Sequence, residues 1–387
     1  MVPSTSRRRF LELVGAHAAL LGVAGSGLVA LPGCGVYRAE TGDAFEPWSF
    51  PGGETVPERV AARAGILAAS PHNTQPWGIA IAPDAVEIRA RLDRHLGAMD
   101  SLRRELHVGL GCCVENVAVA AAAVGRAPTV TLLPSPADPA LVARVALVPA
   151  PPSRSPLFDA IAARHTNRGA YVDGAALPGL EQALRAVADD PRVGLRFLGS
   201  APERARFRDE TVLATEAICA DAEMSADSGR WYRHTAEEIE EHRDGPTLDA
   251  TGAGAATRTI GKSLGRPSDD TMNEYWIDAT RTRQTTGTAF VLLHTAAENL
   301  REDQLRVGRV YQRLHLWATS QGLAMQPLNQ LPERQDREET RGLTPRFGPT
   351  LAELVGRERR AQMAFRIGVP WDDASASPRR PLAWVLS

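Results

Sequence analysis

Apolar and polar positions along the chain describe one order of elements that occurs twice. Residues 56–83, VPERVAARAGILAASPHNTQPWGIAIAP, indicate an amphipathic helix that begins at a proline, then a polar loop and a short apolar strand. Residues 177–202, LPGLEQALRAVADDPRVGLRFLGSAP, repeat the helix and the strand around a shorter loop. A long apolar helix followed by a strand also occurs twice, at residues 108–134 and 307–332, and Gly125 and Gly322 are expected to end the two helices.

This repeat indicates an internal duplication. We therefore predict a first half at residues 56–150 and a second half at residues 151–387. The proline-rich connector between the repeated segments contains a strand, VARVALV. Residues from about 221 to 288 are polar, rich in Gly, Thr and Asp, and have no counterpart in the first half. We predict an insertion there. It could form a lid near the site or an inert excursion on the surface, and the sequence leaves both alternatives open.

The N-terminal residues 1–34 resemble an export signal. Arg7 and Arg8 precede Phe10-Leu11 and a mildly apolar, Gly/Ala-rich stretch, which is typical of the twin-arginine route. An uncleaved anchor helix is the alternative, because the apolar stretch approaches spanning length. The sequence LPGC at 31–34 also resembles a lipoprotein cleavage box, in which Cys34 would be acylated. We expect export through the twin-arginine machinery to the cell envelope or the periplasmic side, with membrane attachment through Cys34 left open, and a linker at 35–55.

Composition narrows the class of partner. The chain has 387 residues, and 43% of them are hydrophobic, which suffices for two domain cores. Its formal net charge of -2 gives no reason to expect nucleic acid as a partner. Of the four cysteines, Cys112 and Cys113 are adjacent in an apolar helical run, so we predict small buried hydrophobes and no disulfide framework. Small molecules are the expected partners.

Three short patterns indicate other functions only weakly. The sequence GKSLG at 261–265 matches the nucleophile elbow of serine hydrolases, but the residues before it make a poor strand. The same GKS has Ala256 where a phosphate-binding loop requires glycine. His294 and Glu298 lie one helical turn apart without an evident third ligand, so we predict no metal site.

Each half carries polar residues that the other half lacks. Residues 70–77, SPHNTQPW, occur only in the first half, whereas ARHTNRGAY at 163–171 and the terminal SPRRPLAWVL occur only in the second. One composite site between the halves, where ligands often bind, is the simplest explanation.

Two kinds of side chain stand out in these segments. Arg164, Thr166 and Arg168 suit a phosphate, because guanidinium forks match its oxygens, and Arg379 and Arg380 could complete the clamp. Asn73 and Gln75 offer uncharged donors and acceptors that suit the edge of a flat heteroaromatic ring. Two alternatives remain open: a solvated basic turn for the arginines, and capping of loop backbone for the amides.

SPHNTQPW, RHTNR, a helix that closes on GLAMQPLN and a terminal RIGVP…PRR together resemble the nitroreductase superfamily of FMN proteins. Within it the chain looks most like the Acg-type branch, over roughly residues 56–387. The resemblance implies an α+β fold in which two nitroreductase-like halves form a pseudo-dimer of antiparallel sheets flanked by helices. It also implies FMN as the cofactor, held between the halves.

Residue by residue, the resemblance implies the following roles. Arg164, His165 and Thr166 would hold the ribityl phosphate, with Arg379 or Arg380 assisting. The pyrimidine edge would face Arg168, while Ser70, Pro71, Asn73 and Gln75 belong to the loop that lines the ring. Leu328 and Asn329 would pass near flavin N5, where the family typically has Glu-Gly, so this loop is a departure from the family pattern.

The implied function is that of an FMN-dependent oxidoreductase that passes two electrons to a small acceptor, a nitroaromatic or a quinone. NAD(P)H or another donor would supply the electrons, and no side chain is nominated as acid or base. The alternative is a flavoprotein that stores or sequesters FMN with little turnover. Bulk near N5 and the insertion would discriminate between the two.

Overall fold

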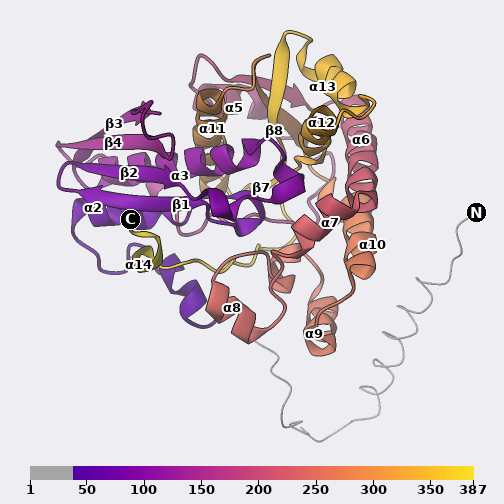
Figure 1. Cartoon of the computed structure of the whole chain (residues 1–387), viewed down its shortest axis with the longest axis horizontal. Helices are drawn as coiled ribbons and strands as arrows, with labels where there is room; N and C mark the ends of the chain where they lie inside the picture. The colour runs from indigo at the N-terminus through magenta and orange to yellow at the C-terminus, as the bar shows by residue number, and fades with distance from the viewer. Residues whose placement is uncertain (1–37) are drawn as a thin grey trace, which may run out of the picture.

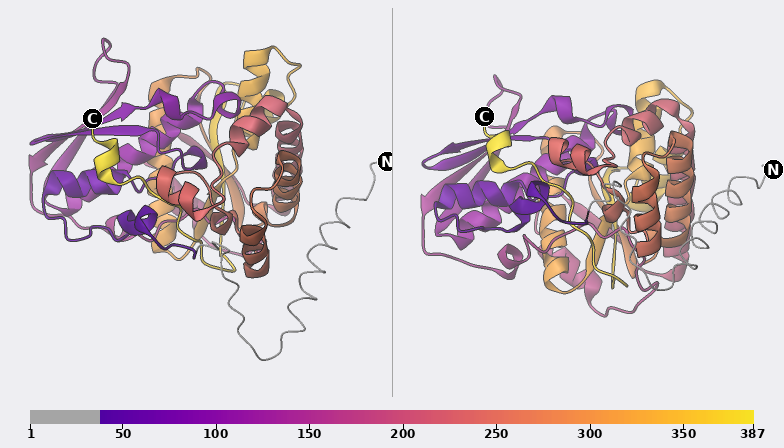
Figure 2. Two further views of the ribbon diagram at one scale, coloured as in Figure 1. Left: turned by 60° about the horizontal axis from the view of Figure 1, so that its bottom comes forward. Right: turned by 90° about the horizontal axis from the view of Figure 1, so that it is seen from below.

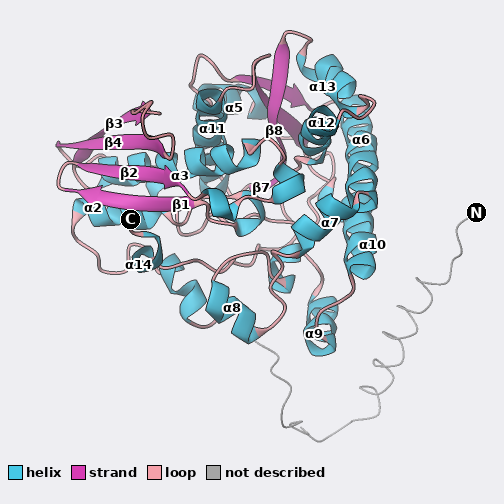
Figure 3. Ribbon diagram, in the orientation of Figure 1, coloured by secondary structure: helices cyan, strands magenta, loops and turns pink. Residues whose placement is uncertain are grey.

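A computed structural model describes residues 38–387 of the chain. The expected export signal, including Arg7, Arg8 and Cys34, lies outside the described residues. Two four-stranded sheets form the centre of the described part (Figures 1 and 3), one at the left of Figure 1 and the other behind the helices at its upper right. All strand pairs within them are antiparallel.

The first half consists of one helix, two strands, a second helix and two more strands. These are α2 (Pro57–Gly65), β1 (Trp77–Ala82), β2 (Ala85–Ala90), α3 (Arg104–Ala123), β3 (Arg126–Leu132) and β4 (Leu141–Pro149), with the sheet order β1-β2-β4-β3. The strand predicted inside the connector is β4, and it pairs with both β2 and β3. A proline begins α2, where the missing N–H costs nothing.

The second half repeats this order. Its elements are α5 (Leu180–Val187), β5 (Gly194–Leu198), β6 (Ala289–Ala296), α11 (Arg301–Ser320), β7 (Ala324–Pro327) and β8 (Arg359–Gly368), with the sheet order β5-β6-β8-β7. Gly125 and Gly322 follow the two long helices with φ angles of 84° and 70°, as their predicted role as helix ends requires. The expected α+β architecture with two antiparallel sheets is confirmed.

Helices α3 and α11 pack directly against each other at two glycines. A Cβ atom on Gly111 would lie 2.1 Å from the Leu305 carbonyl oxygen, and one on Gly308 would lie 2.0 Å from the Val108 carbonyl oxygen. Each hypothetical atom would also lie within 3.0 Å of the other glycine's Cα. The contact is reciprocal, because each glycine lies against the backbone of the other helix.

Helix α3 is long and apolar enough to cross a membrane, judged by length and composition alone. Most of it is buried inside the protein, where Val114 and Val117 are fully covered and join the main hydrophobic core. Packing against α2, α11 and the first sheet therefore accounts for its apolar sequence.

The second half carries a large insertion between β5 and β6, whereas only Pro83 and Asp84 separate β1 from β2. The insertion consists of α6 (Ala201–Ala220), α7 (Ala222–Gly229), α8 (Ala236–His242), η5 (Leu248–Thr251), α9 (Ala255–Leu264), α10 (Asp269–Ala279) and the π-helical η6 (Thr280–Gln284). The segment without a counterpart thus begins at α6, earlier than the expected residue 221.

Both ends of the described chain cross between the halves. The C-terminal segment with α14 (Leu382–Val385) reaches the first sheet, where Leu386 bridges to Ile79, and Figure 2 shows the yellow C-terminal end beside the purple strands. Residues 38–55, expected to be a linker, contain η1 (Asp43–Trp48), and Glu240 of α8 accepts a hydrogen bond from the Ala44 N–H. The remaining elements are η2 (Pro71–Asn73), η3 (Leu92–Arg94), η4 (Gly97–Asp100), α4 (Pro156–Asp159), α12 (Gln330–Arg341) and α13 (Phe347–Val355).

Gly308→Ala should destabilise the protein by about 3 kcal/mol or more, because the added methyl group would force α3 and α11 apart. Helix propensity alone predicts the opposite sign, a gain of about 1 kcal/mol. Gly348→Ala in α13 is the matched control, since its Cβ would make ordinary contacts of 3.5 Å or more. The free energies of unfolding in urea test this, and equal effects of the two substitutions would contradict the packing argument.

Candidate functional site

The two halves and the insertion line one large cavity of about 1130 Å³. Ser70, Pro71 and His72 line it from the first half together with one face of α3. The second half contributes Thr166, Arg168, Gln326, Pro327, Asn329 and Gln330. Residues of η5, α9, α10 and η6 form the wall that belongs to the insertion. The volume exceeds the roughly 300–1,000 Å³ of a typical site for one small ligand, so two molecules could bind together.

The twelve residues predicted from the sequence divide into two groups. Those on the cavity wall are Ser70, Pro71, Thr166, Arg168 and Asn329. Those away from the wall are Asn73, Gln75, Arg164, His165, Leu328, Arg379 and Arg380. Leu328 is fully buried in a small hydrophobic cluster of the second half.

Asn73 and Gln75 bind protein groups and fasten the loop that carries them. The Asn73 amide donates to the carbonyls of Gly245 and Pro378 at 3.1 and 2.8 Å, and its oxygen accepts from Arg379. The Gln75 amide donates to the Arg243 carbonyl at 2.8 Å, and its oxygen accepts from the Arg380 N–H at 2.9 Å. Both residues have positive φ, so these hydrogen bonds hold a strained backbone in place beside the cavity.

Arg164 and Arg379 form a buried cluster of positive charge beneath this loop. Arg164 donates from Nη2 to the Leu67 carbonyl at 3.1 Å, while its Nε and Nη1 have no partner. The Arg379 guanidinium donates to Asn73 and backbone carbonyls, and its Nε has no partner. Trp48 covers both guanidiniums, with its ring 5.9 Å from Arg164 and 4.6 Å from Arg379.

No carboxylate within residues 38–387 forms an ion pair with Arg164, Arg168 or Arg379. Burial lowers the pKa of all three guanidiniums, and the charge of Arg164 lowers the pKa of Arg379 further. The His165 ring packs edge-on against Trp48, and burial together with Arg164 and Arg379 lowers its pKa to about 3. Burying cations without counterions is costly, so an anion bound at this cluster would lower that cost.

The insertion is fastened to both predicted motifs. A Cβ on Gly252 would lie 2.3 Å from the Arg168 backbone, so only glycine permits this close approach at its φ of 71°. Arg168 in turn donates to the Ala250 carbonyl at 3.1 Å. Ser228 of α7 is 2.9 Å from His72 Nε2. The insertion therefore forms a wall of the site rather than a separate surface excursion.

Three residues in or beside the site were not among those predicted from the sequence. Trp48 lies in the presumed linker, far in sequence from the arginines that it covers. Glu105 and Glu333 line the cavity from α3 and α12, yet both occur in stretches rich in ordinary helical charges. A buried carboxyl can be recognised only after the helices are placed, because amphipathic patterns assign isolated charges to solvent.

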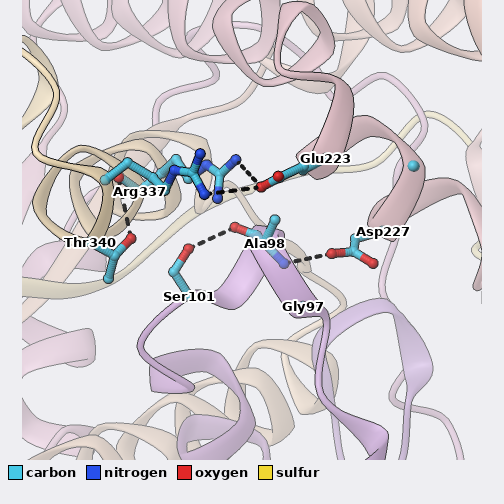
Figure 4. Close-up of a pocket in the computed structure, with 9 residues that line it drawn as sticks. Gly97, Ala98, Ser101, Glu223, Asp227, Arg337 and Thr340 are labelled. Atoms are coloured by element: carbon cyan, nitrogen blue, oxygen red, sulfur yellow. Dashed lines mark hydrogen bonds and ion pairs between the residues drawn. The ribbon is translucent and has the colours of Figure 1, made fainter.

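A second, open hollow lies between η4, α7 and α12 (Figure 4). Its charged groups already have partners: Arg337 binds Asp221 and Glu223, and Asp227 accepts from the Ala98 N–H at 2.7 Å. This compensation contrasts with the unpaired arginines near the large cavity, which is therefore the candidate site.

Arg164→Met should raise the free energy of unfolding of the cofactor-free protein by about 1 kcal/mol or more, because an uncompensated buried cation is removed. Millimolar inorganic phosphate should stabilise the wild type against urea and leave this variant unchanged. Arg154→Met, at an exposed position, is the control and should retain both properties. Loss of stability in Arg164→Met would show that the charge is already compensated.

Comparison with known proteins supports the resemblance stated from the motifs. No family model matches the chain. The Mycobacterium tuberculosis protein named "Putative NAD(P)H nitroreductase Rv3131" is 28% identical over 344 residues, which cover 87% of this chain and 92% of the relative. The M. tuberculosis protein named "Putative NAD(P)H nitroreductase acg" is 26% identical over 347 residues, 85% of this chain and 94% of the relative.

Among solved structures, the FMN-dependent nitroreductase NfnB from Mycobacterium smegmatis in complex with NADPH aligns with a TM-score of 0.36 and 17% identity. This alignment covers 60% of the present chain and 97% of the other. The sequence relatives span nearly the whole chain, both halves and the insertion included. The expected resemblance to the nitroreductases, and to their Acg-type members in particular, is thereby confirmed.

Proposed function

We propose that this chain is an FMN-dependent oxidoreductase in which the cofactor lies between the two halves and passes two electrons to a small acceptor. The observation that carries the proposal is the buried, uncompensated arginine cluster beside a cavity formed by both halves. NAD(P)H is the proposed electron donor, as the names of the relatives suggest for those proteins.

The residues present fit a phosphate-bearing cofactor. Arg164 and Arg379 have unpartnered guanidinium nitrogens, and the His165 Nδ1 is also without a partner. A phosphate would supply acceptor oxygens for these donors and neutralise the buried charge. Cys112 and Tyr311 line the cavity and interact electrostatically with Arg164, so the cluster lies just behind the cavity wall.

The cavity wall fits a flat ring. Arg168 presents its charge from one side, Ser70 and Pro71 come from the first half, and Asn329 comes from the segment after β7. When bound, FMN would supply two-electron chemistry by accepting and releasing a hydride. Arg168 would stabilise negative charge that develops on the ring, and the surrounding wall would exclude water.

Storage of FMN without turnover is the second candidate, favoured by the insertion that covers the cavity. The volume argues for turnover, because about 1130 Å³ leaves room for an acceptor beside one cofactor. The two candidates differ in whether a hydride donor can reach the ring.

The absorbance spectrum of the purified protein, before and after anaerobic NADPH, tests the proposal. We expect a bound-flavin spectrum that bleaches with NADPH. Flavin that bleaches with dithionite alone would favour storage, and absence of flavin even after FMN is added would refute the proposal. Arg164→Ala combined with Arg168→Ala should yield apo-protein, whereas the exposed-site control Arg154→Ala should retain full flavin.

We also propose that the chain is exported by the twin-arginine route, on the basis of residues 6–12, SRRRFLE, and the apolar stretch after them. Substituting lysine for both Arg7 and Arg8 should retain the protein inside the cell. The mass of the mature protein tests the fate of Cys34, because acylation adds the mass of its lipid. Export of the double-lysine variant at the wild-type level would contradict the proposed route.

A further inference from the structure

A pair of buried carboxyl groups lines the cavity where the two halves meet. Glu105 belongs to the first turn of α3 in the first half, and Glu333 belongs to the first turn of α12 in the second. Each residue is 5% exposed, and burial together with the nearby charge of Glu105 raises the pKa of Glu333. Two carboxylates that share one buried site do not both ionise readily, so this arrangement favours one proton on the pair.

The charges around the pair indicate which carboxyl holds the proton. Arg104 donates to Asp336 at 2.8 Å and to Glu105 at 3.4 Å, so its charge is shared between those two groups. Burial raises the pKa of Glu333 well above the ordinary range, and the negative charge of Glu105 raises it further. Burial also raises the pKa of Glu105, but Arg104 opposes that change. The ion pair with Arg104 favours Glu105 as the carboxylate, and Glu333, which forms no ion pair with any described residue, is favoured as the protonated carboxyl.

The pair lies beside Asn329, which belongs to the segment that the family resemblance places near the N5 atom of a bound flavin. The Asn329 side chain opposes the rise of the Glu105 pKa, and its oxygen accepts from the Ala364 N–H at 2.9 Å. Oε2 of Glu333 and Oε1 of Gln330 are buried on this wall without any partner. An unpartnered carboxyl oxygen beside an empty volume is positioned to contact a molecule bound there.

The remaining charges of the cavity wall indicate an uncharged acceptor. Lys262 is 2.7 Å from Asp249, and Arg281 is 2.6 Å from Glu216, so the cations of the insertion are already paired. Leu248, Ile260 and Trp276 add apolar surface to the same wall. Among the described residues, Arg168 is the unpaired cation of this wall, and the proposed function assigns it to the flavin ring. An anionic acceptor would therefore meet the Glu105 carboxylate without a further cation to balance it, whereas a neutral aromatic molecule needs none.

We propose that Glu333, supported by Glu105, is the catalytic acid that protonates an uncharged quinone during its reduction in this cavity. This inference rests on the proposed function, with reduced flavin as the hydride donor. The quinone takes up a hydride, which carries two electrons and one proton. The Glu333 O–H bond breaks, and its proton forms the second O–H bond of the hydroquinone. Glu333 is left as a carboxylate beside Glu105, and a proton from solvent restores the acid.

The protonation of the pair can be tested without turnover by infrared spectroscopy. The wild type at pH 7 should show a protonated-carboxyl band that disappears in Glu333→Gln. The band should shift in Glu105→Gln, because an uncharged amide then replaces the carboxylate beside Glu333. Asp100, whose pKa burial and Glu105 raise to about 7, should contribute a separate band that remains in Glu333→Gln. Glu339→Gln, a half-exposed position of the same helix, is the control and should leave both bands unchanged. A wild type without a band that depends on Glu333 would overturn the proposal.

The two half-reactions then separate this proposal from the proposed function. In Glu333→Gln, bleaching by NADPH should match the wild type, while reoxidation by a neutral quinone should slow about 100-fold. In Glu105→Gln, removal of the like charge lowers the Glu333 pKa, so the pH above which reoxidation slows should shift downward. Failure of the wild type to bleach would refute the proposed function. Normal bleaching together with wild-type reoxidation in Glu333→Gln would refute the acid role alone.

Discussion

The contact between Gly111 and Gly308 is the constraint on which the rest of the structure depends. Because neither residue has a side chain, the backbones of α3 and α11 approach until a Cβ on either one would touch a carbonyl oxygen of the other. This approach brings the N-terminal turn of α3 beside α12 and sets the loop after α2 against the second half. The cavity, both charge clusters and the interface between the halves all follow from this crossing.

Two groups of buried charge of opposite sign lie at this interface, and each is incomplete without a small molecule. Arg164 and Arg379 form no ion pair with a described carboxylate, and burial together with the charge of Glu105 raises the pKa of Glu333. Such arrangements reduce stability, and proteins concentrate them where binding or chemistry takes place. One cluster suits the phosphate of the proposed cofactor, and the other suits proton transfer to the proposed acceptor.

Sequence reasoning identified compact motifs that lie at or beside the cavity, and for the loop amides it left open the choice between the ring edge and backbone capping. Thr166 and Arg168 line the cavity as predicted, because a short motif at a helix end keeps its residues together. Asn73 and Gln75 were assigned to the ring edge, yet their amides bind backbone carbonyls and position the loop. Short polar side chains in loops bind whichever backbone groups lie near, and those groups come from Gly245, Pro378 and Arg243, distant segments that no local pattern reveals.

The sequence by itself determined the elements and their duplication, because hydrophobic periodicity and helix-ending glycines act locally. It also placed the two long helices and the strands that follow them in equivalent positions of each half. Only the tertiary structure decided that Trp48 covers the arginines, that the insertion forms a cavity wall, and that Glu105 meets Glu333. The physical reason is that burial and electrostatic coupling depend on which surfaces meet, and the two carboxyls become neighbours only when α3 and α12, from different halves, pack around the same volume.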